Sequence, residues 1–106
     1  MSTISENYTE GYTGDIIYQL LDNGLPFDAT GMSIDIVLKD QAGLTVDVVG
    51  DVSWETAALS KPKYIPDPTD FVAARSPYTA HWKVTNGTKV LFYPQGAPIV
   101  WRVHKQ

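Results

Sequence analysis

The feature that most constrains the fold is the alternation of apolar and polar residues in short runs. The clearest run, Tyr78–Thr85, reads YTAHWKVT and places every second residue on one apolar face. Met32–Lys39 and Ile99–His104 alternate in the same way. Because successive side chains of a β-strand point to opposite faces, this period of two predicts strands with one buried face. Such strands have to pack against a second layer.

Turn residues separate these runs. Asn86-Gly87 is a strong hairpin signal and leads from Tyr78–Thr85 into an expected strand at Lys89–Tyr93. Asp15–Leu21 is expected to form another strand, and Leu44–Glu55 one or two, with a bend at Gly50. Turns at regular short spacing favour an all-β fold, an antiparallel β-sandwich of about seven strands. Helix is limited to possible single turns at residues 55–59 and 69–75.

Two segments are expected to lie outside the strands. Lys61–Thr69 has three prolines in nine residues, which argues against a central strand and favours an extended surface connection. Residues 1–12 are mostly polar and lack core periodicity, so we expect an N-terminal arm at 1–12 and a sandwich domain at 13–106. The acidic, polar start argues against a signal peptide. The lack of a long apolar run argues against a membrane contact.

Charge is distributed unevenly along the chain. Eight Lys or Arg against twelve Asp or Glu give a net charge of −4, which argues against a nucleic-acid partner. Residues 1–60 hold ten acidic and one basic residue, a balance of −9, whereas residues 61–106 hold two acidic and seven basic residues, a balance of +5. We expect the two halves to interleave in the sheets, with a two-faced module as the alternative.

The sequence offers few groups for catalysis or metal binding. There is no cysteine, and the two histidines, His81 and His104, have no metal-ligand spacing to other residues. We therefore expect no enzyme activity, no cofactor and no metal. The stretch Leu21–Gly31 and the nearby Asp40 supply acidic oxygens that suit either calcium or tight turns, and the turn interpretation is favoured.

Aromatic residues in irregular stretches are the best candidates for contacts with a partner, since residues on inward strand positions are expected to form the core. A carbohydrate-binding module that uses exposed aromatic rings is the competing hypothesis. The predicted protein-interface residues are Tyr8, Tyr12, Tyr64, Ile65, Phe71 and Arg75.

The arrangement of several motifs resembles a known family. A polar corner at residues 21–31 (LDNGLPFDATG) leads into the strand MSIDIVLKD, the strand SPYTAHWKVT follows, and Phe92-Tyr93-Pro94 precedes the last strand. This order resembles the N-terminal immunoglobulin-like domain of phage upper baseplate proteins of the BppU type, over about residues 12–104.

The resemblance implies that the antiparallel sandwich is an immunoglobulin-like β-sandwich and that the chain is a virion structural protein. Baseplate members continue into a receptor-binding or trimerising region that the 106 residues lack, so the expected role is a small accessory: a tail, baseplate or neck adaptor, or a capsid decoration protein. The implied partners are other virion structural proteins (capsid or tail/baseplate subunits), possibly the chain itself. The implied location is the virion, after synthesis in the host cytoplasm.

Overall fold

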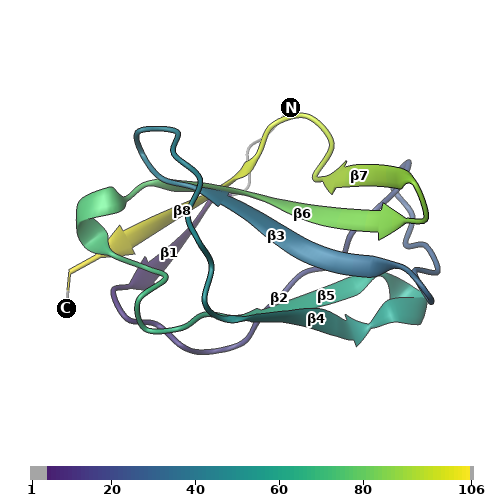
Figure 1. Ribbon diagram of the computed structural model, residues 1–106, viewed down its shortest axis with the longest axis horizontal. Coiled ribbons are helices and arrows are strands. Elements are labelled where there is room, and N and C mark those ends of the chain that lie inside the picture. Colours follow the sequence, from purple (N-terminus) through teal and green to yellow (C-terminus); the bar gives the residue numbers. More distant parts are fainter. Residues whose placement is uncertain (1–4, 106) are drawn as a thin grey trace.

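The computed structural model describes residues 5–105 and has two β-sheets that lie face to face (Figure 1). Two single 3₁₀ turns, η1 and η2, lie between strands, as expected. Of the helical segments in the described chain, none is long and apolar enough to cross a bilayer. The elements are β1 (Ser5–Thr9), β2 (Ile16–Ile17), β3 (Ser33–Lys39), β4 (Asp51–Thr56), η1 (Ala57–Leu59), β5 (Lys61–Ile65), η2 (Ala73–Arg75), β6 (Tyr78–Asn86), β7 (Lys89–Tyr93) and β8 (Ile99–His104).

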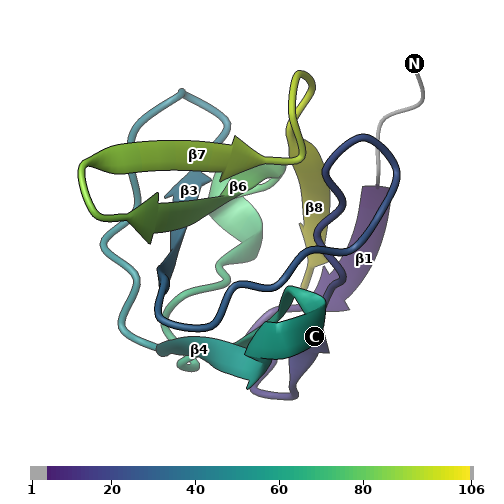
Figure 2. The same cartoon turned by 90° about the vertical axis from the view of Figure 1, so that its right-hand side faces the viewer.

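The larger sheet has the strand order β1-β8-β6-β3, with β7 also paired to β6, and the smaller has the order β2-β5-β4. The predicted all-β class is confirmed, and so are the strands at 33–39, 78–86, 89–93 and 99–104. Pairing is antiparallel except between β1 and β8, which run parallel over five residue pairs (Figure 2). A purely antiparallel arrangement was therefore the wrong expectation at this edge.

Two strands share one side of β6. Trp82 of β6 is opposite Tyr93 of β7, whereas Ala80 is opposite Ile99 of β8. Residues 94–98 thus form a loop that interrupts what is otherwise a single line of pairing. The free edge of β7 lies on the far side of that strand, and within residues 5–105 no strand pairs with it.

The core fills the space between the sheets, and the predicted alternation decides which side chains reach it. The inward residues of β6 and β8 are 4 % exposed or less. Each sheet contains strands from both halves of the chain, which confirms the predicted interleaving; Glu55 and Lys63, for instance, form an ion pair at 3.3 Å between β4 and β5. The buried core residues are Ile16, Leu20, Ile36, Leu38, Val46, Tyr64, Phe71, Tyr78, Ala80, Trp82, Val84, Tyr93, Ile99, Trp101 and Val103.

The prediction of a connection at Lys61–Thr69 was wrong for residues 61–65. Residues 61–65 form β5, the middle strand of the smaller sheet. Pro62 is buried there and is opposite Trp54, next to a register shift in β4, a position where a missing N–H is tolerated. Its carbonyl still accepts a hydrogen bond from the N–H of Tyr18 at 3.2 Å.

The expected arm at 1–12 was also wrong over the part that the structure describes. Residues 5–9 form β1, and Tyr8 and Tyr12 pack against the core. Residues 1–4 lie outside the described residues. The expected strand at 15–21 is shorter than predicted, since only Ile16 and Ile17 join the ladder, and the region 44–55 contributes β4 at 51–56 with a single bridge at Thr45.

Candidate functional site

The six predicted interface residues do not form one exposed surface. Tyr64 and Phe71 have no exposed surface, so the expectation that they are poorly buried was wrong. Tyr64 occupies an inward position of β5, and its ring stacks on Trp101 with centroids 6.0 Å apart. Phe71 contacts Tyr8 and Trp101 at 5.4 and 5.6 Å. These rings hold the sandwich together and are not available to a partner.

Tyr8 and Tyr12 are half-buried and contact each other, with centroids 5.0 Å apart. The hydroxyl of Tyr8 donates to the Glu6 carboxylate at 2.6 Å, and that of Tyr18 donates to the other oxygen of the same group. Burial, followed by the hydrogen bond to Glu6, raises the pKa of Tyr8 and of Tyr18. The Tyr18 hydroxyl therefore links β1 to the segment after β2, whereas the hydroxyl of Tyr8 bonds within β1 and its ring connects the strand to Phe71 and Trp101.

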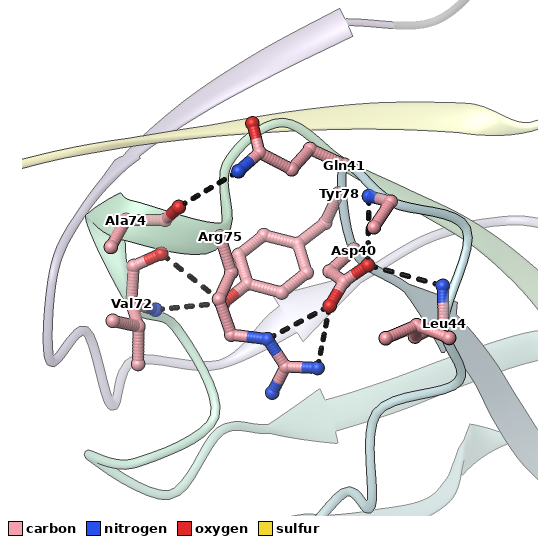
Figure 3. A network of polar contacts seen from close by, with 8 residues as sticks. Asp40, Gln41, Leu44, Val72, Ala74, Arg75 and Tyr78 are labelled. Carbon is pink, nitrogen blue, oxygen red and sulfur yellow. Dashed lines mark hydrogen bonds and ion pairs between the residues drawn. The ribbon is translucent and has the colours of Figure 1, made fainter.

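Arg75 and Ile65 remain partly exposed, but Arg75 has a partner within the chain. Its Nε and Nη2 donate to Oδ2 of Asp40 at 3.0 and 2.7 Å (Figure 3). Gln41 adds two contacts to η2, from its backbone N–H to the Arg75 carbonyl and from its side-chain amide to the Ala74 carbonyl. The guanidinium hydrogen bond lowers the pKa of Asp40. Arg75 thus anchors the 40–44 turn.

Two further polar residues fasten this end of the sandwich. The Tyr78 hydroxyl contacts the backbone of Val72, accepting from its N–H at 2.9 Å and donating to its carbonyl at 3.2 Å (Figure 3). The Asp70 carboxylate, 2 % exposed, accepts from the N–H groups of Val49, Gly50 and Asp67 and from the Tyr64 hydroxyl. Every one of these contacts is internal, which indicates a structural role.

The acidic residues proposed for turns do form turns. Asp22 and Leu25 exchange backbone hydrogen bonds around Asn23 and Gly24, whose φ angles are 52° and 81°. Asp28 accepts the N–H of Thr30 at 2.9 Å, and Oδ1 of Asp40 accepts the N–H groups of Ala42 and Leu44. The turn interpretation is confirmed. Within residues 5–105, no three acidic or histidine side chains are grouped so that they could hold a metal ion.

Among the residues that the structure describes, three consecutive large hydrophobic side chains are exposed only on β7. Val90, Leu91 and Phe92 follow one another and are 45, 41 and 47 % exposed. Val90 and Phe92 lie on the outer face of the sheet, because they are opposite Thr85 and Lys83 of β6. A shallow hollow of about 420 Å³ continues this surface and is lined in part by Val37, His81 and Phe92.

Three lysines surround the β7 surface. Lys89 begins the strand, Lys83 is opposite Phe92, and Lys39 lines the hollow. Asp35, opposite Lys83 on the next strand, is the nearby acidic residue in the ladder. We missed this surface at the sequence level, although the run VLFY, with no polar residue between its apolar ones, was a signal that both faces of β7 are apolar.

A second hollow, of about 350 Å³, lies where the corner at residues 18–24 meets the loop that follows β7. Its floor is apolar and buried, and its rim carries three exposed side-chain amides. The floor contains Leu20, Trp82, Tyr93 and Ile99, and the rim contains Gln19, Asn23 and Gln95.

No model of a known protein family matches the chain, and neither a curated protein nor a solved structure resembles it significantly. Its function therefore has to be inferred from its own surface and from its sequence patterns.

Proposed function

We propose that the chain is a non-enzymatic, immunoglobulin-like structural protein of a phage virion, which docks on a neighbouring subunit through the free edge of β7. The exposed run Val90–Phe92, on an edge that no strand within residues 5–105 pairs with, is the observation that carries this proposal. The location in a virion is inferred from the resemblance of the sequence to phage baseplate domains.

The strand order supports an immunoglobulin-like assignment. Immunoglobulin sandwiches place strands B, E and D side by side in one sheet and strands G, F and C in the other. The orders β2-β5-β4 and β8-β6-β3 correspond to these sets. Tyr78, at the start of β6, also bonds through its hydroxyl to the backbone six residues upstream, as the tyrosine corner of such domains does at the start of strand F.

The edge of β7 suits the addition of a strand from another protein. An unpaired edge offers free N–H and C=O groups, and charged residues, proline or a covering segment usually protect such an edge. On β7, three consecutive exposed apolar residues and the buried Tyr93 lie between Lys89 and the half-buried Pro94. A neighbouring strand would pair with the backbone and cover Val90 and Phe92 on one face.

The charged residues near β7 indicate which kind of partner strand would bind there. Three lysines against one aspartate give this surface an excess of positive charge on a chain whose net charge is −4. An apolar strand flanked by Asp or Glu is therefore the complementary occupant. We propose such a strand on a capsid or tail subunit.

A carbohydrate-binding module built on an exposed aromatic platform remains the alternative function. Phe92 is the one aromatic side chain in the exposed class among residues 5–105, and it is part of the β7 surface. A flat platform of several rings has less support than the docking edge.

The test is incorporation into particles. Purified virions are analysed by quantitative mass spectrometry with the native chain, with Phe92→Asp and with Leu44→Asp, since Leu44 is also exposed but lies in the 40–44 turn, outside β7 and its partner strand β6. We expect the native chain and Leu44→Asp to be incorporated equally and Phe92→Asp to be lost, with no change in melting temperature. Absence of the native chain from particles would refute the virion role, and normal incorporation of Phe92→Asp would refute docking through β7.

A further inference from the structure

The smaller sheet also ends in a free strand edge, on β4. This strand pairs with β5 on one side, and no other described strand joins its far side. The side chains of Asp51, Ser53 and Glu55 are exposed on its outer face. Val52 and Trp54 are half-buried and pack against the core. β4 is therefore a strand with two apolar residues and an acidic residue near each end.

Such a strand matches the partner inferred for the β7 edge, which is apolar and surrounded by lysines. The ion pairs of the described chain involve neither Lys89 nor Asp51. Glu55, by contrast, is already paired with Lys63 of β5 at 3.3 Å. Asp51 is thus the acidic residue of β4 that is available to a lysine of another molecule.

Charge decides how these two edges can pair between copies of the chain. β7 against β7 would bring Lys89 and its neighbouring lysines toward the same residues of the other copy. β4 against β4 would bring Asp51 and Glu55 together in the same way. Like charges opposite each other destabilise a strand pair, whereas β4 against β7 joins opposite charges. The charges therefore favour a head-to-tail contact over either symmetric one.

The alternation of side chains along β4 and β7 also matches. Residues that lie opposite each other in a sheet share a face, so a parallel pairing can place acid beside lysine and apolar beside apolar residues. The resulting pairs are Asp51 with Lys89, Val52 with Val90, and Trp54 with Phe92. The outer face of β7 is then continuous with the inner face of β4, and the two sandwiches lie on opposite sides of the joined sheet. An antiparallel pairing would instead use Glu55, which Lys63 already neutralises.

We propose that the β7 edge of one copy adds to the β4 edge of a second copy, so that the chain assembles head to tail. This inference rests on the proposed role of β7 as a docking edge and names a partner strand for it. A contact between two different edges leaves one of each free at the ends of a row, so the row grows until it closes into a ring. The copy whose β7 is free can dock on a capsid or tail subunit.

Self-association of the purified chain is measured by sedimentation velocity over a wide range of concentrations. We expect species larger than a dimer to form as the concentration rises and to dissociate in high salt, because the contact is charged. Lys89→Asp and Asp51→Lys should each weaken the association about tenfold or more. Asp15→Lys makes the same change of charge next to β2, at the opposite edge of the smaller sheet, and should leave it unchanged. Equal melting temperatures verify that these exposed substitutions leave the fold intact.

A mixture of Lys89→Asp and Asp51→Lys provides the decisive measurement. Each variant alone brings like charges together, whereas in the mixture every contact joins two native or two substituted positions of opposite charge. We expect the mixture to recover the association of the native chain.

A native chain that stays monomeric at all concentrations would overturn the head-to-tail contact. So would a loss of association in Lys89→Asp but not in Asp51→Lys, because it would indicate pairing of β7 with β7. Neither result decides the docking function, which is tested by incorporation into particles. Conversely, absence of the native chain from particles would leave its self-association in solution intact.

Discussion

The hydroxyl of Tyr64 donates a 2.7 Å hydrogen bond to Oδ2 of Asp70, and neither residue is more than 2 % exposed. The same carboxylate also accepts three backbone N–H groups. One aspartate thereby ties the segment before β4 to the end of β5 and to the turn that follows it. Burial, followed by the hydrogen bond to Asp70, raises the pKa of Tyr64, so the phenol stays protonated and keeps donating.

Replacing Asp70 should destabilise the domain strongly. Asp70→Ala leaves three backbone N–H groups and a phenol without their acceptor, and we expect the free energy of unfolding to fall by about 3 kcal/mol or more. Urea denaturation measures this loss. Asp47→Ala is the matched control, because Asp47 is exposed, and it should change stability by less than about 0.5 kcal/mol. Equal stability of the two variants would contradict the structural role of Asp70.

Gly50 should tolerate no side chain. A Cβ there would overlap the carbonyl oxygen of Ile65 and lie 2.8 Å from the backbone nitrogen of Asp67. Because both are backbone atoms, Gly50→Ala has to displace the end of β5, and we expect a loss of about 3 kcal/mol. Gly43 has open space but a φ of 79°, so Gly43→Ala should cost only about 1 kcal/mol. Thermal denaturation of both variants checks the order, and the reverse order would refute the close contact.

Two phenylalanines should differ sharply in their contribution to stability. Phe71 is fully buried, whereas Phe92 is 47 % exposed. Phe71→Ala should lower the free energy of unfolding by about 3–5 kcal/mol through the cavity that it leaves. Phe92→Ala should have little effect on folding. A chemical denaturation series decides the point, and a mild effect at Phe71 would reinstate it as an interface candidate.

The ion pair between Asp40 and Arg75 should make stability depend on pH. The hydrogen bond from Arg75 holds the pKa of Asp40 below its usual range in the folded state. Because the pKa of Asp40 is lower in the folded than in the unfolded chain, its ionised carboxylate stabilises the fold at pH values above the unfolded pKa. This stabilisation is lost as the pH falls below about 4. We expect Asp40→Asn and Arg75→Gln to melt below the native chain at neutral pH and to approach it in acid. A difference in melting temperature that stays constant with pH would contradict this linkage.

The alternation of apolar residues predicted the strands that contribute most to the core. β3, β6 and β8 follow it closely, and the Asn-Gly dipeptide predicted the β6–β7 hairpin. We did not predict β5 because proline usually interrupts a strand. Pro62 is tolerated there because it lies next to the register shift in β4, which the sequence does not show. We did not predict β1 because its residues are mostly polar. It forms a strand by pairing with β8, which lies at the other end of the chain.

The same limit applies to the functional surfaces. Tyr64 and Phe71 were predicted to be poorly buried because they lie in a stretch rich in proline and aspartate. Tyr64 instead faces inward on β5 and Phe71 packs against Trp101. The exposure of the run Val90–Phe92 depends on the loop after Tyr93. At this loop the partner strand of β6 changes from β7 to β8. Neither fact is contained in the local pattern, because each depends on contacts between distant segments.

The parallel pairing of β1 with β8 also determines how the domain bears mechanical load. β1 begins where β8 begins, so a force that pulls the start of β1 away from the end of β8 acts along both strands. Such a force shears the hydrogen bonds of all five residue pairs together instead of opening them one after another. The segment predicted as an N-terminal arm therefore acts, over residues 5–9, as a shear clamp between the first and the last described strands.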